Sequence, residues 1–139
     1  MKSEDEPVSP DEFVIRAIWT EYYDPALPLP ILSGGFTPKR NETEGISVFR
    51  AACVVNPEDV LVVFGEDKRD KYALALLPVA ELSALGLTVQ PAKIDAVSGH
   101  AVLPELNITA QKADKAKWRD VQKQLAALAN ARIVRAPKT

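Results

Sequence analysis

Residues Glu12 to Thr20 read E-F-V-I-R-A-I-W-T, and this stretch decides which class of fold the chain can adopt. In an extended segment successive side chains point to opposite faces, and here both faces carry apolar residues. Arg16 is the one charged side chain between Phe13 and Trp19. The stretch therefore predicts a strand that is covered on both sides, with Arg16 either near an end or paired with a carboxylate.

A second buried strand is predicted where Tyr72 to Leu77 form a strongly apolar run. Pro78 then opens a helix that runs to Leu85 and ends at Gly86, because proline suits the first helical position and glycine the position after the last. Leu87 to Gln90 resume a strand pattern. We expect this compact unit to place its two strands side by side, and the pattern leaves their relative direction open.

Further segments carry helix or strand patterns. Asn56 followed by Pro57 is typical of a helix start, although the β-branched residues after it also allow a strand. Residues Thr109 to Asn130 place apolar side chains at three- and four-residue spacing, which predicts one amphipathic helix. Strands are also predicted over Ile46 to Arg50, His100 to Leu103 and Ala131 to Arg135.

Together these elements predict a single α+β or α/β domain over residues 12–139. Its core would be one mixed sheet of four to six strands, with one long C-terminal helix and short helices. The length of 139 residues fits one domain, and 47% hydrophobic with 26% charged residues is typical of a globular protein. Residues 1–11 are acidic, contain two prolines and hold few apolar groups, so we expect a flexible tail.

Charge and composition argue against several classes of function. The 17 basic and 19 acidic residues give a net charge of −2 with the signs interleaved, so nucleic acid is not an expected partner. No apolar run approaches the roughly 20 residues of a membrane span, and the acidic start M-K-S-E-D-E-P lacks the apolar core of a signal peptide. The single cysteine, Cys53, lies between apolar residues and is expected to be buried in a reducing compartment. We therefore expect a cytoplasmic protein without a membrane partner.

The segment between Tyr22 and Leu32 holds three prolines within six positions, which predicts an extended, polyproline-like connector. One hypothesis is that it presents aromatic and proline surfaces to a protein partner. The residues of this candidate partner-binding surface are Tyr22, Tyr23, Pro28 and Pro30. The alternative is that the connector crosses the core with its leucines inward and its prolines outward.

Residues Ser33 to Arg50 form the candidate functional loop. Adjacent Gly34 and Gly35 permit positive φ and a close approach of backbone to a ligand, as in loops that cradle phosphate. Lys39 and Arg50 would supply positive charge for an anionic group. However, no P-loop or dinucleotide-binding glycine motif is present, and two nearby glutamates oppose the positive charge. The alternative is a glycine turn followed by an exposed, charged loop.

His100 is the only histidine and stands at the start of a predicted strand. A second histidine would be needed for a histidine-based metal pair, so no metal site and no cofactor are predicted. A catalytic role would require the fold to bring a nucleophile or a carboxylate to this ring. The alternative is a strand-edge histidine hydrogen-bonded to the backbone, with Gly99 before it as a turn residue.

Three short pieces of the chain resemble a pattern that recurs in small uncharacterised bacterial proteins. They are F-T-P-K at Phe36 to Lys39 leading into I-S-V at Ile46 to Val48, L-G-L-T-V-Q-P at Leu85 to Pro91, and G-H-A-V-L at Gly99 to Leu103. The resemblance implies that the three segments belong to one shared fold. It implies no activity and transfers no site residue.

Two hypotheses for the function follow. The first is a small bacterial protein-interaction module, an accessory or regulatory subunit whose partner is another protein, without enzymatic activity. The second is a small enzyme or anionic-ligand-binding domain that uses Gly34, Gly35, Lys39, Arg50 and His100. A pocket in which Arg50 and His100 converge beside the glycines would favour the second, with Arg50 holding the anion and His100 acting as acid or base. The oligomeric state is left open.

Overall fold

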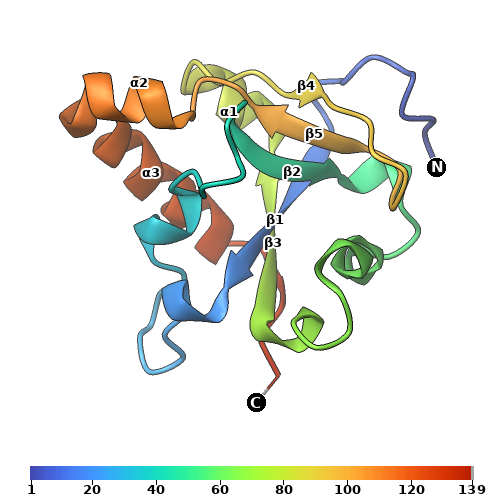
Figure 1. Cartoon of the computed structure of the whole chain (residues 1–139), viewed down its shortest axis with the longest axis horizontal. Coiled ribbons are helices and arrows are strands. Elements are labelled where there is room, and N and C mark those ends of the chain that lie inside the picture. The colour runs from blue at the N-terminus through green and yellow to red at the C-terminus, as the bar shows by residue number, and fades with distance from the viewer. Residues whose placement is uncertain (139) are drawn as a thin grey trace.

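The computed structural model describes residues 1–138 and confirms an α+β fold with one long helix (Figure 1). Its single sheet has six strands in the order β4-β5-β2-β1-β3-β6, and every neighbouring pair is antiparallel. The strands are β1 Phe13–Trp19, β2 Ile46–Arg50, β3 Tyr72–Pro78, β4 Gln90–Pro91, β5 His100–Leu103 and β6 Ile133–Arg135. The α-helices are α1 Val79–Ala84, α2 Ile108–Ala113 and α3 Lys115–Asn130. Short 3₁₀ helices are η1 Thr20–Tyr22, η2 Ser33–Phe36, η3 Ala51–Cys53, η4 Pro57–Phe64 and η5 Arg69–Lys71.

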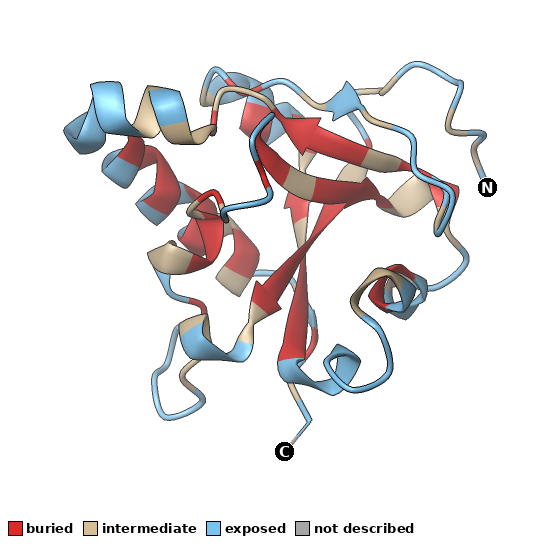
Figure 2. Ribbon diagram, in the orientation of Figure 1, coloured by how far each residue is buried: buried red, intermediate tan, exposed pale blue. Residues whose placement is uncertain are grey.

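Strand β1 lies inside the sheet between β2 and β3, and both of its faces are buried, as predicted. Val14 and Ile18 belong to a core shared with Trp118 and other residues of α3 on one face. Ile15 and its neighbours on the other face pack against residues of η4. Figure 2 shows the buried strands at the centre and exposed residues on the outer side of α3. The sheet therefore has two differently covered faces.

The stretch predicted as one helix from Thr109 to Asn130 is two helices, because Asp114 ends α2 and caps α3. The backbone of Asp114 lies outside the helical region, with φ −145° and ψ 78°. Its Oδ1 accepts a hydrogen bond from the N–H of Lys117 at 3.2 Å. An aspartate side chain that satisfies a free N–H at a helix start competes with continued helix, and that local preference breaks the pattern here.

The strands on either side of α1 are not side by side, contrary to the prediction. Strand β3 lies next to β6, whereas β4 forms the opposite edge of the sheet beside β5. The chain leaves α1 at Gly86, where φ is +80°, and passes across the end of the sheet to β4 (Figure 1). Leu87 lies in this connection and is buried in the core on the α3 side of the sheet. Its burial stabilises the path of the connection.

The proline segment turns back on itself instead of running extended through the core. Tyr23 and Ile31 form an antiparallel bridge, and the N–H of Asp24 donates to the Pro30 carbonyl at 2.8 Å. Leu27 and Leu29 are 43% and 64% exposed, so the predicted inward leucines are wrong. Asp24 Oδ1 accepts the N–H of Ala26, and this local turn directs the tip outward.

The acidic N-terminal segment, expected to be a flexible tail, lies against the domain. Arg50 donates hydrogen bonds to the carbonyls of Glu4, Glu6 and Pro7 at 3.3, 2.8 and 3.3 Å. The N–H of Gly99 donates to the Glu4 carboxylate at 2.8 Å. Burial of a guanidinium requires acceptors, and the carbonyls of this segment supply them.

The single cysteine, Cys53, is buried, as predicted, and this burial raises the pKa of its thiol. Within residues 1–138 no helix combines the length and apolar character needed to cross a bilayer.

Candidate functional site

A cleft of about 410 Å³ lies on the face of the sheet opposite α3. Its floor comes from the strands, and its walls come from the loop between η2 and β2, from the end of η4 and from the turn after it. The floor residues are Ala17, Ser47, Phe49, Tyr72 and His100. The walls include Lys39, Glu42, Phe64 and Lys68. A concave site of this volume, with apolar walls and a few polar groups, is typical of small-molecule binding.

An ion pair between Arg16 and Glu42 stands at one side of the cleft. Arg16 Nη1 donates to Glu42 Oε2 at 2.8 Å, and both side chains are buried. Arg16 also donates to the carbonyls of Gly35 and Ser47, and Glu42 accepts the N–H groups of Ser47 and Lys39. Burial alone would raise the pKa of Glu42, but the Arg16 charge and these donors outweigh it and hold the pKa below its ordinary value. The carboxylate is therefore ionised and fully engaged.

Lys39 has no comparable partner. Its side chain is half-buried, and within residues 1–138 it forms no ion pair. Burial lowers the pKa of Lys39, the Arg16 charge lowers it further, and Glu42 opposes both effects only in part. The cleft therefore contains a desolvated ammonium whose charge an additional anion would stabilise.

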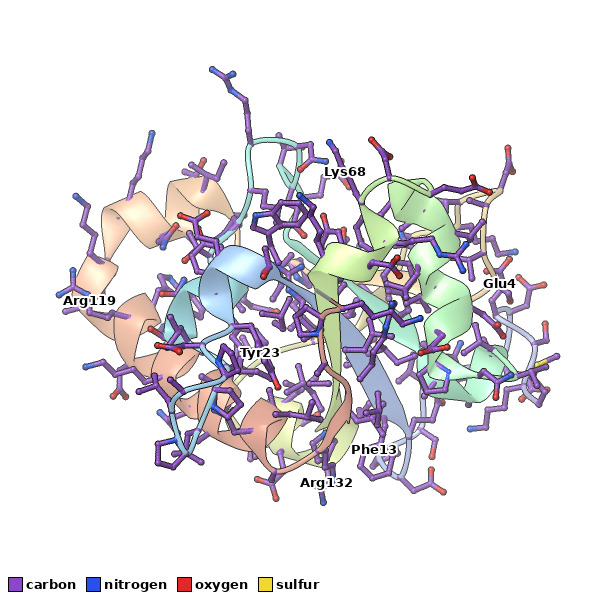
Figure 3. The ribbon with its side chains drawn as sticks, turned by 90° about the horizontal axis from the view of Figure 1, so that it is seen from below. Glu4, Phe13, Tyr23, Lys68, Arg119 and Arg132 are labelled. Atoms are coloured by element: carbon purple, nitrogen blue, oxygen red, sulfur yellow. The ribbon has the colours of Figure 1, made fainter. Side chains whose placement is uncertain are left out.

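Lys68 is the second free cation at the cleft. It is exposed, follows η4 in the charged turn, and forms no ion pair with any residue of the described chain. Figure 3 places it on the opposite side of the molecule from the pair formed by Phe13 and Arg132. Since Arg16 neutralises Glu42, Lys39 and Lys68 leave the cleft positively charged.

Two pairs of aromatic rings form the aromatic wall of the cleft. The Phe64 and Tyr72 rings are stacked, with centroids 4.0 Å apart and an interplanar angle of 21°. Phe49 and His100 make an edge-to-face pair at 5.3 Å. Burial raises the pKa of Tyr72, so its hydroxyl stays neutral. Planar groups of a ligand can pack on such a wall.

The predicted backbone hydrogen bond of His100 is present. Nδ1 lies 2.6 Å from the carbonyl oxygen of Ala92, which can only accept, so Nδ1 carries the proton. This bond fixes the tautomer and leaves Nε2 as an acceptor. His100 is thus a strand residue whose ring also lines the cleft.

The five residues of the predicted ligand site do not share one cavity. Lys39 and His100 line the cleft. Arg50 is 1% exposed and gives two hydrogen bonds of 2.9 Å to the Glu12 carboxylate. Gly34 lies under the Tyr22 ring, where a Cβ would come within 2.6 Å of ring carbons, and Gly35 offers its carbonyl to Arg16. Gly34 therefore allows the close packing of Tyr22, and Gly35 provides an acceptor for Arg16.

The predicted partner-binding residues lie in the turned proline segment. Tyr22 is half-buried against Gly34, and Tyr23 is held in the bridge to Ile31. Pro28 is exposed and Pro30 is half-buried. These residues sit apart from the cleft.

Sequence reasoning missed Lys68, Phe64 and Tyr72 as cleft residues. The available signal was the alternation of β1, β2 and β3, which places Ala17, Phe49 and Tyr72 on one face. The carboxylate expected near Arg16 is Glu42. Within residues 1–138 no group of three or more His, Cys, Asp or Glu side chains is placed to hold a metal ion.

Comparisons with known proteins give no match to a family model, to a curated protein or to a solved structure. The resemblance of three short segments to small bacterial proteins therefore stays a prediction.

Proposed function

We propose that this protein binds a small anionic ligand that carries a planar group, and that the cleft beside Lys39 is the binding site. The observation that carries the proposal is the half-buried, unpaired ammonium of Lys39 next to an aromatic wall. Burying a cation without a partner destabilises a protein, so a residue of this kind is typical of a functional site. An anionic ligand supplies the missing charge.

Each part of the cleft has a role in this proposal. Lys39 and Lys68 hold the anionic group, Lys39 from the wall and Lys68 from the rim. The planar group packs against Phe64, Tyr72 and the edge of His100. The Arg16–Glu42 pair keeps the Lys39 backbone in place, because Glu42 accepts the Lys39 N–H at 3.0 Å.

The role we propose is binding and not catalysis. Glu42, the carboxylate of the cleft, is paired with Arg16, and among residues 1–138 His100 is hydrogen-bonded to the Ala92 carbonyl and not to a nucleophile or a carboxylate. We place this binding protein in the cytoplasm, where a lone buried thiol such as Cys53 remains reduced.

Calorimetric titration with adenosine monophosphate tests the proposal, because this probe combines an anion with a planar ring. The wild type is expected to bind saturably, and the double variant Lys39→Gln/Lys68→Gln to bind at least about tenfold more weakly, since each charge-assisted hydrogen bond contributes about 1.5 to 3 kcal/mol. Lys123→Gln is the matched control, because Lys123 is an exposed lysine of α3 that does not line the cleft. Absence of saturable binding, or equal affinity in the double variant, would contradict the proposal.

A second candidate function is supported by the tip of the proline segment. Leu27 and Leu29 are exposed there between prolines, and Asn130 fixes the base of the turn through two hydrogen bonds to Ile31. We propose that this tip inserts into an apolar groove of a partner protein, as in an interaction module.

The test of this second function is affinity purification of the native chain followed by comparison with a variant. Leu27→Ser/Leu29→Ser is expected to lose a stoichiometric companion that the wild type retains. Val134→Ser, at an exposed apolar position in β6, is the control and is expected to retain it. A companion that stays with the double serine variant would overturn this function.

A further inference from the structure

The cleft is not isolated: a second hollow of about 260 Å³ adjoins it. Trp19, Lys39, Lys68 and Tyr72 line this second hollow, and the last three of them also line the cleft. Both free lysines therefore stand at the junction of two cavities. An anion held by them would have open space on two sides.

Each cavity has an aromatic wall of its own. Phe49, Phe64 and His100 belong to the cleft alone, and Trp19 belongs to the second hollow alone. The Tyr72 ring lies between them, stacked on Phe64 and edge-to-face with Trp19 at 5.0 Å. Trp19 is only half-buried, so part of its indole remains open to a ligand.

We infer that the two cavities together bind a ligand in which two planar groups are joined through an anionic link, the chemistry of a dinucleotide. The inference rests on the proposed function, since it requires an anion at Lys39 and Lys68. A ligand with one planar group would fill one aromatic cavity and leave the other empty. A ligand with two would use Trp19 as well as Phe64 and His100.

The sheet register sets the span of such a ligand. Phe49 lies opposite Ile15 on β1, and Trp19 is four residues further along the same strand. At about 3.3 Å per residue, Trp19 lies about 13 Å along the strand direction from the position of Phe49. Lys39 and Lys68 line both cavities, so an anion held by them is shared between the two. A linker of phosphate or pyrophosphate between two nucleosides fits this order of ring, anion and ring.

A fluorescence and calorimetry series tests the inference with adenosine monophosphate, adenylyl-adenosine and diadenosine diphosphate. At least one of the two-ring probes is expected to bind the wild type about tenfold or more tightly than the monophosphate does. A gain of this size is expected from one additional base stacked on an aromatic side chain. Tighter binding of adenylyl-adenosine would indicate a phosphate link in the natural ligand, and tighter binding of diadenosine diphosphate would indicate a pyrophosphate link. Trp19→Leu is expected to remove that gain and to leave the affinity for the monophosphate unchanged within about twofold.

Outcomes of this series separate the two proposals. If the monophosphate binds and neither two-ring probe binds more tightly, the inference is wrong and the proposed function stands. If Trp19→Leu weakens all three probes equally, the inference is also wrong. If no probe binds, both the proposed function and the inference of a two-ring ligand are wrong.

If the Trp19→Leu variant does not fold, an NMR measurement on the wild type tests the same inference. The indole N–H resonance of Trp19 is expected to shift with the tighter two-ring probe and to stay in place with the monophosphate. Trp118, in the core on the other face, is the internal control. A Trp19 resonance unmoved by either two-ring probe would overturn the inference.

Discussion

The ammonium nitrogen of Lys39 lies 5.2 Å from the centre of the Tyr72 ring. A cation over an aromatic face is stabilised by about 0.5 to 2 kcal/mol, which offsets part of the cost of burying this lysine. The contact also orients the ammonium along the aromatic wall of the cleft. Lys39 is thus held in position in a site where, among residues 1–138, no carboxylate forms an ion pair with it.

Replacing Lys39 is expected to separate binding from stability. The lowered pKa of Lys39 means that the folded protein disfavours the charged form. Lys39→Met should therefore change the free energy of unfolding by no more than about 1 kcal/mol, or raise it, while binding of adenosine monophosphate weakens about tenfold or more. Urea denaturation and calorimetry measure the two effects. A strongly destabilised Lys39→Met variant would show that the lysine is structural.

Anion binding should weaken at alkaline pH. Because the pKa of Lys39 lies below its ordinary value of 10.5, the free protein loses this positive charge before an exposed lysine would. The affinity for the monophosphate is therefore expected to fall as the pH rises from 8 toward 10.5. Lys39→Arg is the control, since a guanidinium keeps its charge over this range. Equal pH profiles in the two proteins would contradict the assignment of Lys39.

The Arg16–Glu42 pair is expected to be essential for stability. Glu42→Gln removes the charge that balances buried Arg16, so the free energy of unfolding should fall by about 3 to 5 kcal/mol. The double variant Arg16→Met/Glu42→Gln should recover part of that loss, because no buried charge is left unpaired. Chemical denaturation of the single and double variants measures the coupling. Strictly additive effects would show that the two side chains do not act as a pair.

Acid should unfold the protein through Glu12. Burial would raise the pKa of Glu12, but hydrogen bonds from Arg50, the Ser9 N–H and Lys2 lower it from 4.5 to about 2. A carboxyl whose pKa is depressed by folding contributes stability above its unfolded pKa, and that contribution is lost as the pH falls from about 4.5 to 2. The expected loss is about 3 kcal/mol. Glu12→Gln should be less stable at neutral pH and should lack this part of the pH dependence. An identical pH dependence in the variant would refute the role of Glu12.

The sequence predicted those parts of the fold that local patterns determine. Alternation in β1 predicted a strand covered on both faces, and Asn56 with Pro57 marked the start of η4. It did not predict the break at Asp114, because a cap and a solvent-facing helix position look alike in one sequence. The prediction that β4 lies beside β3 was wrong, because it relied on the short distance in sequence between the two strands. The structure pairs β4 with β5 instead.

The cleft could be predicted only in part. Lys39 and His100 were singled out, but Lys68 looked like any residue of a charged turn, and antiparallel pairing of β1 with β3 is what brings Tyr72 opposite Trp19 and near Lys39. Arg50 was expected to bind an anion, and it does bind a carboxylate, that of Glu12 within the chain. Whether a charged side chain lines a cleft or forms an ion pair within the protein depends on contacts between segments that are distant in sequence, and one sequence does not show these contacts.

The most direct test of the central claim is an NMR titration of the isotope-labelled protein with adenosine monophosphate. The backbone amides of Ala17, Phe49, Tyr72 and His100 are expected to shift saturably, while those of α3 stay in place. In Lys39→Gln/Lys68→Gln the same shifts should be lost at equal ligand concentration. Shifts spread over α3, or shifts that persist in the double variant, would contradict an anion-binding cleft at Lys39.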